Sequence, residues 1–465
     1  MITPNDFCTY TDHTNESKRK PKIDDIILDE YLIQEGYHCM YTGQQSGMTR
    51  VRVVDKRVIL ITPNKLYEDL QDIIRVDNKP WLQPLKDNWK LLTPIAMQQM
   101  RRIEPKILRD TATTSYVPFE NGIVTITRKG IELKPYAEVL VEKSCIMADK
   151  IIQRKVDMSF SDYKKGVWYK FCENAVGSEG LPYLMRSIGY LLTNYKDRSN
   201  SKMIIFVDAD HPQNLNAEGG TGKSLIAKTA LSAIRNVFYS DGKQGSEKQR
   251  FRFQGVNRMH DIICIDDVDR DFKHGAIYNA ITGDFATEEK YKSQEVIVYE
   301  ESPKFVITAN FKLKLKGGSD NRRSCVIAFT DHYSEKHTPY DEFGHRFFEE
   351  WNGTRSEEFQ YFYAFMFHCI QLYLSKGIEN YNFDDTTYVN EELLERIHNV
   401  KHHFIGANNA MRYLDWRKII AMEDENALDV LKDVMRLEGY VINNSIRRRI
   451  DGQANASQLY YFEKK

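Results

Sequence analysis

The pattern of apolar and polar residues predicts an α/β domain with a parallel sheet in the middle of the chain. Continuous apolar runs occur at residues 202–208 (KMIIFVD), 261–267 (DIICIDD) and 304–310 (KFVITAN). Runs of this length are typical of strands that are buried on both faces. An amphipathic helical pattern, SLIAKTALSAIRNVF, follows the first run. Because strands that alternate with helices favour a parallel sheet, we place this domain at residues 201–345.

The segments before this domain have other patterns. Residues 1–22 are polar, which is typical of a flexible tail. Residues 23–136 mix strand-like and helical runs and end in YVPFENGIVTITRKGIELKPY, a strand, an Asn-Gly turn and a strand. We expect a small α+β domain there. Residues 137–200 carry apolar residues at helical spacing and predict a helical, collar-like segment.

Two further segments follow the central domain. Residues 346–395 predict a helical extension, whose aromatic stripe we expect in the core. Residues 396–465 predict helices followed by a β-hairpin that carries Arg447, Arg448 and Arg449. This order favours a winged-helix domain whose arginines bind the DNA backbone. A charged, solvated hairpin edge explains the same arginines equally well.

Composition narrows the classes of function. The chain has 465 residues, with 65 Lys+Arg against 66 Asp+Glu and a net charge of −1. A protein that is basic over its whole surface is thereby excluded, so nucleic-acid binding would need local basic patches. The seven cysteines form no C-x-x-C pair, which excludes a zinc ribbon and favours a reducing compartment. Apolar runs are far shorter than the roughly 20 residues of a membrane span, so we expect a cytoplasmic protein with no membrane partner.

A glycine-rich segment, Ala217-Glu-Gly-Gly-Thr-Gly-Lys-Ser224, lies between the first strand and the amphipathic helix. In this context glycines let backbone N–H groups converge on phosphate oxygens, and the helix N-terminus favours anions. Lys223 would reach the β- and γ-phosphates of ATP, and the Ser224 hydroxyl would bind Mg²⁺. The residues expected to bind the nucleotide are Gly219, Gly220, Thr221, Gly222, Lys223, Ser224 and Leu225. The alternative is a chance glycine-rich turn before a helix.

Three further elements follow in order. Asp266 and Asp267 end the second strand and suit Mg²⁺ binding and activation of an attacking water, roles that we assign to the pair. Asn310 ends the third strand and could hold that water against the γ-phosphate, although an Asn often simply starts a turn. Arg322 and Arg323 suit an arginine finger or a solvated pair. Each element is weak alone, but their order within about 100 residues favours a nucleotide hydrolase.

The segments EGGTGKS, IICIDD, KFVITAN and NRR resemble motifs A, B and C and the arginine finger of superfamily 3 helicases, and in particular the helicase part of phage- and plasmid-encoded primase–helicases. The resemblance covers about residues 140–380, although Ala217 stands where that pattern has glycine. It implies a P-loop AAA+ core, a hexameric ring and ATP-driven translocation on single-stranded DNA. It also implies a DNA-binding hairpin, which here would carry Lys290, Tyr291 and Lys292.

The sequence thus predicts an ATP-dependent replicative DNA helicase of phage or plasmid type, in the host cytoplasm if phage-encoded. It would use ATP and Mg²⁺, act on single-stranded and replication-fork DNA as a homo-hexamer, and have a primase or initiator as partner. Two alternatives stay open. One is the helicase part of a primase–helicase whose primase is on another chain. The other is a nucleotide switch that serves as an assembly platform and recruits replication factors.

Overall fold

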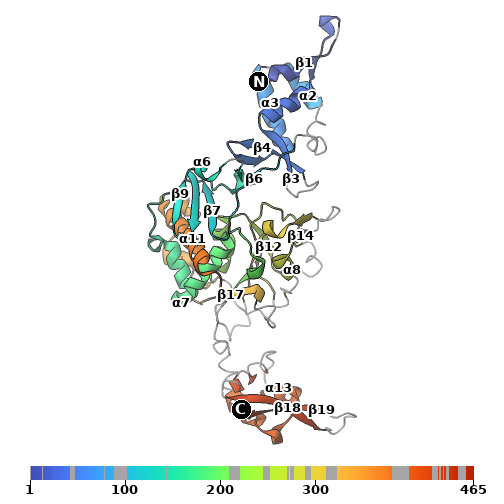
Figure 1. The fold of residues 1–465 in the computed structure, drawn as a ribbon. Coiled ribbons are helices and arrows are strands. Elements are labelled where there is room, and N and C mark those ends of the chain that lie inside the picture. Colours follow the sequence, from blue (N-terminus) through green and yellow to red (C-terminus); the bar gives the residue numbers. More distant parts are fainter. Residues whose placement is uncertain are drawn as a thin grey trace. The chain divides into compact units, whose positions relative to one another are not determined.

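The computed structural model consists of two compact units, residues 1–207 with 220–380, and residues 208–219 with 381–465. Each unit is described by itself. The structure describes residues 2–12, 14–41, 48–77, 79–87, 102–141, 144–208, 220–243, 252–269, 272, 277–287, 295–310, 322–379, 397–420, 428, 431–432, 434–435, 439–448 and 457–464. Elements carry the labels of Figure 1.

The N-terminal residues, where a flexible tail is expected at 1–22, contain short helices and strands. Helix α1 (Pro4–Phe7) leads into β1 (Cys8–Tyr10), which pairs antiparallel with β2 (Pro21–Ile23). Phe7 is fully buried and lies 5.1 Å from the Tyr31 ring of α2 (Asp25–Gln34). The few apolar residues of this polar segment therefore find partners that lie later in the chain.

A five-stranded sheet forms the body of the N-terminal region, in the order β3-β4-β5-β10-β6. Its strands are β3 (Tyr37–Tyr41), β4 (Met48–Val54), β5 (Arg57–Leu60), β6 (Lys106–Ile107) and β10 (Ser144–Met147), and the accompanying helices are η1 (Glu16–Lys18), α3 (Pro63–Asp77), η2 (Lys79–Trp81) and α4 (Leu82–Asp87). β10 pairs parallel with both β5 and β6. Within the predicted helical segment 137–200, residues 144–147 instead form strand β10, in which Cys145 and Met147 are buried beside Val51 and Val58.

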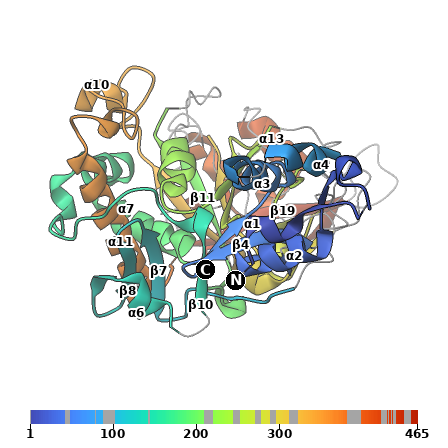
Figure 2. The ribbon, with the colours of Figure 1, turned by 90° about the horizontal axis from the view of Figure 1, so that it is seen from above.

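Two long helices join a small antiparallel sheet to the central domain. The sheet consists of β7 (Thr114–Phe119), β8 (Gly122–Thr127) and β9 (Ile131–Lys134), as the Asn-Gly turn predicts. Helix α11 (Glu357–Lys376) lies beside α7 (Val167–Leu192) and next to this sheet (Figure 1, Figure 2). A Cβ on Gly189 of α7 would lie 2.0 Å from the Cys369 carbonyl oxygen, so this close approach of the helices requires glycine. The predicted aromatic stripe of α11 is core, and its buried residues include Phe359, Phe362, Tyr363, Phe365 and Phe367.

The central domain contains the predicted parallel sheet, in the order β12-β13-β16-β11-β17. Its strands are β11 (Met203–Asp208), β12 (Val237–Asp241), β13 (Ile262–Asp266), β16 (Lys304–Thr308) and β17 (Ser324–Phe329). β13 pairs parallel with β12 and β16, and β16 pairs parallel with β11. All residues of β11 and β16 are buried, as expected for strands covered on both faces. The protein is therefore a mixed α/β protein with several sheets, one of them parallel.

Short elements complete this unit. They are α6 (Tyr136–Val139), η4 (Ala148–Lys150), η5 (Tyr163–Lys165), η6 (Arg198–Asn200), the π-helical segment η7 (Leu225–Ala230), α8 (Tyr278–Thr282), β14 (Phe285–Thr287), β15 (Glu295–Ile297), η10 (Tyr299–Glu301), α10 (Pro339–Phe343) and η11 (Glu350–Asn352). β14 and β15 pair antiparallel as a hairpin.

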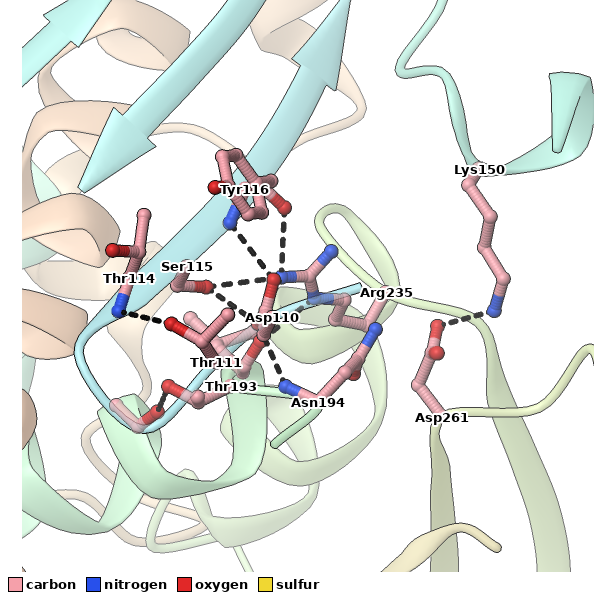
Figure 3. A network of polar contacts seen from close by, with 12 residues as sticks. Asp110, Thr111, Thr114, Ser115, Tyr116, Lys150, Thr193, Asn194, Arg235 and Asp261 are labelled. Atoms are coloured by element: carbon pink, nitrogen blue, oxygen red, sulfur yellow. Dashed lines mark hydrogen bonds and ion pairs between the residues drawn. The ribbon is translucent and has the colours of Figure 1, made fainter. Parts of the chain in front are cut away.

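Buried charges hold the edge of the parallel sheet where its strands begin (Figure 3). Arg235, just before β12, donates to Asp110 at 3.4 Å and to the Tyr116 carbonyl at 3.1 Å, and both charged side chains are almost fully buried. The Asp110 carboxylate also accepts hydrogen bonds from the backbone N–H groups of Tyr116 and Asn194, both at 2.8 Å. Nearby, Lys150 pairs with Asp261 at 2.7 Å. These contacts tie the antiparallel sheet and α7 to the central domain.

The second unit has its own small core. It contains η13 (Lys401–Phe404), η14 (Ala407–Asn409), α13 (Tyr413–Ile420) and a hairpin of β18 (Tyr440–Arg448) and β19 (Ser457–Lys464). Phe404, Trp416 and Phe462 pack together at its centre. The hairpin is present as predicted, whereas the winged-helix assignment and the other domain boundaries stay predictions.

Two further features concern the cysteines and the apolar character of the helices. All seven cysteines are buried, and none of them is in a disulfide. Among the described helices, none combines the length and apolar character needed to cross a bilayer.

We predict that Arg235→Met destabilises the first unit by about 3–5 kcal/mol, because the Asp110 carboxylate stays buried without its cation. The measurement is urea unfolding followed through the emission of the buried Trp168 and Trp351. Arg235→Met combined with Asp110→Asn should recover part of the loss. The control is Lys170→Ala, which removes the exposed pair with Glu173 and should leave the midpoint unchanged. An unchanged midpoint in Arg235→Met would show that the buried pair does not hold this edge together.

Candidate functional site

The predicted site lies where the parallel strands end. In a parallel sheet the carboxyl ends of all strands lie at one edge, and ligands bind in the crevice outside that edge. The register pairs Ile265 of β13 and Ile205 of β11 with the same residue, Ile307 of β16. Asp266 and Thr308, one residue further along, therefore come side by side. The glycine-rich segment that follows β11 reaches the same edge.

The Asp266 carboxylate is the centre of this group. Its Oδ1 atom accepts a hydrogen bond from the Ser224 hydroxyl at 2.7 Å and one from the Thr308 hydroxyl at 2.5 Å. The Tyr239 hydroxyl of β12 lies 3.5 Å from Oδ2. Burial, together with the charge of Asp266, raises the pKa of Tyr239, so this phenol stays protonated near neutral pH. Four elements thus contribute an oxygen atom to one small polar cluster.

Asp267 has different partners, so the structure separates two carboxylates that the sequence left together. Its φ angle is +55°, which is unusual for a residue other than glycine, and its backbone N–H donates to the Thr308 hydroxyl at 2.8 Å. Its carboxylate accepts a hydrogen bond from Asn310 Nδ2 at 3.0 Å and pairs with Lys243. The bond to Asp267 raises the pKa of Lys243, which stays charged. Backbone strain of this kind occurs often at functional sites.

The glycine-rich segment packs closely on α7. Gly220 and Gly222 both have positive φ angles, of +114° and +95°. A Cβ on Gly222 would lie 2.7 Å from the Phe171 ring. Lys223 is only 5% exposed, and its Nζ donates to the Thr221 hydroxyl at 2.9 Å. Turns with such glycines direct successive backbone N–H groups into one concavity, which binds anions.

The other predicted residues lie in different places. Arg322 is exposed just before β17, whereas the half-buried Arg323 lies over the Tyr278 ring of α8 at 5.4 Å. Arg447 lies in the second unit, where its Nε donates to Gln458 at 2.8 Å. Leu225 begins η7, and Arg448 ends β18. The residues Gly219, Lys290, Tyr291, Lys292 and Arg449 lie outside the described part of the chain.

Three residues that lie at this edge, Tyr239, Lys243 and Thr308, are not among those predicted from the sequence. The run VFYS followed by Asp241-Gly242 has the form of a short strand and a turn, and this signal could have located β12. Nothing in the sequence indicates that the Lys243 side chain meets Asp267, because the contact depends on the pairing of β12 with β13.

Residues 215–323 match the model of a family of unknown function, DUF5906. This segment runs from the glycine-rich segment to the arginine pair and is less than half of the chain. No curated protein matches the chain.

Two solved structures of the NrS-1 C-terminal region are similar to the chain. The A form apo structure has 12% identity and a TM-score of 0.42, and the match covers 94% of this chain and 99% of that one. A second structure has 12% identity and a TM-score of 0.40, and the match covers 90% of this chain and 91% of that one. Similarities at this level carry no argument about function.

We predict that Gly222→Ala destabilises the first unit more than Gly344→Ala does. Both glycines have positive φ, but a Cβ on Gly344 meets nothing within 4 Å, whereas one on Gly222 meets Phe171. Gly344→Ala therefore lowers the stability only through its unfavourable backbone conformation. The measurement is the thermal midpoint together with the emission of Trp168, whose ring lies 5.0 Å from Phe171. Equal shifts in the two variants would contradict the close packing of Gly222 on α7.

Proposed function

We propose that this chain is a magnesium-dependent ATPase with a P-loop AAA+ core that acts as a DNA helicase in replication. The observation that carries the proposal is the hydrogen bond between Ser224 and Asp266 at the carboxyl edge of the parallel sheet, next to Lys223. A hydroxyl after a glycine-lysine turn and a carboxylate at the end of a neighbouring strand form the arrangement that binds Mg²⁺ and nucleotide phosphates in P-loop hydrolases.

The oxygen atoms fit Mg²⁺. In octahedral coordination at about 2.0–2.1 Å, neighbouring ligands lie about 2.9 Å apart. The Ser224 and Asp266 oxygens are 2.7 Å apart, and both are hard ligands of the kind that Mg²⁺ prefers. When bound, the ion would neutralise charge on the phosphates. The Thr308 hydroxyl donates to the same carboxylate oxygen and fixes its orientation.

Asp267 and Asn310 support a separate role in catalysis. The amide of Asn310 and the carboxylate of Asp267 are hydrogen-bonded at the ends of neighbouring strands. Together they offer a donor and an acceptor that could orient a water molecule, and the carboxylate could accept its proton. We therefore assign Asp266 to the metal and Asp267 to the water.

The phosphates would bind in the turn that holds Gly220 and Gly222. The two positive φ angles suit a concave row of N–H donors, and the buried Lys223 adds a positive charge beside them. Adenine and ribose contacts stay outside this proposal.

The DNA-directed part of the proposal depends on the resemblance to superfamily 3 helicases and on the position of the β14–β15 hairpin. This hairpin lies in the chain between β13 and β16, the two strands that end in Asp266 and Thr308. A change at the γ-phosphate could therefore reach it from both sides. Its lysines, Lys290 and Lys292, would grip the DNA backbone in a ring of six subunits, and Arg447 to Arg449 would add contacts from the second unit. A primase or initiator would act as partner.

The first prediction for this function concerns ATP turnover. Lys223→Ala and Asp266→Asn should each lower the turnover number at least about 100-fold, because each removes electrostatic stabilisation of the phosphates or their ion. Lys170→Ala, an exposed lysine on α7, is the matched control and should keep full activity. Phosphate release is measured with and without single-stranded DNA. Stimulation by DNA supports a motor, and slow turnover that DNA leaves unchanged favours the nucleotide switch. Full activity in both site variants would overturn the assignment of the site.

The second prediction separates the two arginines. Arg322 is exposed and could reach the nucleotide of a neighbouring subunit, so Arg322→Ala should keep nucleotide binding but lose about 10³–10⁵ in turnover. Arg323→Ala removes the contact with Tyr278 and should mainly lower stability. Arg346, an exposed arginine near Glu349, provides the control Arg346→Ala.

Mixed preparations of two variants test whether Arg322 acts on the nucleotide of a neighbouring subunit. Arg322→Ala mixed with Lys223→Ala should recover part of the activity, because each variant supplies the half-site that the other lacks. Lack of recovery at every mixing ratio would place Arg322 in its own subunit's site.

A further inference from the structure

Two histidines and a glutamate converge on the surface of the first unit. They are His332, His337 and Glu342, and one ligand atom of each lies within 4.8 Å of those of the other two. The Nε2 atoms of His332 and His337 lie 3.0 Å and 3.7 Å from the same oxygen, Oε2 of Glu342. The two nitrogens therefore face one carboxylate oxygen from two sides.

The backbone holds these side chains in place. Ser334 and His337 close a tight turn with hydrogen bonds in both directions, at 3.0 Å and 3.3 Å. Thr338 and Asp341 form a capping box at the start of α10, which carries Glu342. A turn and a capped helix thus position ligands that are five residues apart in sequence.

Further groups orient the ligands from outside. Asn174 of α7 donates to the other glutamate oxygen, Oε1, at 2.8 Å, which leaves Oε2 directed at the histidines. The His337 ring stacks on the Tyr333 ring, with 5.9 Å between centroids and 14° between planes. Ligands of metal ions are commonly oriented by such outer contacts.

We propose that His332, His337 and Glu342 form a zinc-type transition-metal site with one open coordination position. Two imidazoles and one carboxylate are a ligand set that binds Zn²⁺, with a fourth position left for water or another ligand. In a tetrahedral site with ligand distances of about 2.0–2.1 Å, ligand atoms lie about 3.4 Å apart. The nitrogen–oxygen separations of 3.0 Å and 3.7 Å lie on either side of this value. Imidazole nitrogens select a transition metal over Mg²⁺, so this site is distinct from the proposed nucleotide site.

Both histidine rings turn a nitrogen toward the same oxygen atom of Glu342. A cation bound among these three atoms would accept a lone pair from each imidazole nitrogen and from the carboxylate oxygen.

Metal binding at this site would affect the glycine-rich segment, because the two are in contact. A Cβ on Gly220 would lie 3.4 Å from the Ser334 backbone, so the turn of the metal site packs next to Gly220. Metal binding would hold this turn and restrict the segment beside it. The test below uses no nucleotide, and its result is therefore independent of the proposed ATPase.

The test is titration of the untagged, metal-stripped full chain with Co²⁺, a spectroscopic substitute for Zn²⁺. We expect one ion per chain with the intense visible absorption of four-coordinate cobalt, and displacement of the ion by Zn²⁺. His332→Ala, His337→Ala and Glu342→Gln should each weaken binding at least about 10-fold, and Asn174→Ala should weaken it about 10-fold through the outer contact. His403→Ala changes an exposed histidine of the second unit and should leave binding unchanged.

Circular dichroism of each variant confirms that these surface changes leave the fold intact. Substoichiometric binding, or equal binding by the three ligand variants and the wild type, would overturn the site. A weak absorption spectrum, typical of six-coordinate cobalt, would overturn the zinc-type assignment.

Discussion

The pairing of β13 with β16 determines where the polar groups of the proposed nucleotide site lie. A shift of this register by one residue would turn Asp266 to the opposite face of the sheet and separate it from Thr308. Two further parallel pairings fix the register, because β16 also pairs with β11 and β13 also pairs with β12. The residues of β11, β13 and β16 are almost all apolar and buried, so any slip would also expose core residues to water. The hydrophobic sheet thereby keeps charged groups at one fixed edge.

At the opposite edge of the same sheet, charged residues lie inside the protein at or just before the first residues of the strands. Lys304, the first residue of β16, is buried and donates to the Tyr190 carbonyl at 2.6 Å. Burial lowers the pKa of Lys304, and burial also lowers the pKa of Lys196, to about 7, beside the Tyr299 ring. Such groups are costly unless they are hydrogen-bonded, and carbonyls of α7 and its following loop supply partners. These directional contacts determine which segments pack at this edge. An apolar interface would be less selective.

The sequence was sufficient where local pattern and tertiary structure agree. The strands β11, β13 and β16, the β7–β8 hairpin and the closeness of Ser224 to Asp266 follow from apolar runs, turn residues and the rule that parallel strands end together. It was insufficient where residues far apart in the chain determine the local structure. Ser144–Met147 has the spacing of a helix, but the open position between β5 and β6 selects a strand. Phe7 lies in a polar segment, and its packing partner Tyr31 on α2 is not indicated by the local pattern. The different partners of Asp266 and Asp267 follow from a single residue with positive φ, which no pattern of residue types reveals.

Phe171 connects the two proposed sites through a continuous aromatic stack. Its ring lies next to Gly222 and also stacks on Tyr333 at 5.2 Å, and Tyr333 in turn stacks on the His337 ring. Asn174, one turn further along α7, hydrogen-bonds Glu342. One helix face thus supports both the glycine-rich segment and the two-histidine cluster. Packed aromatic rings deform little, so a displacement of the turn at Ser334 would be transmitted to Gly222 rather than absorbed between them. A ligand that binds one site more tightly in one of two positions of this stack would then change the affinity of the other site for its own ligand. The second ligand would change the affinity for the first by the same factor, because coupling between binding sites is reciprocal.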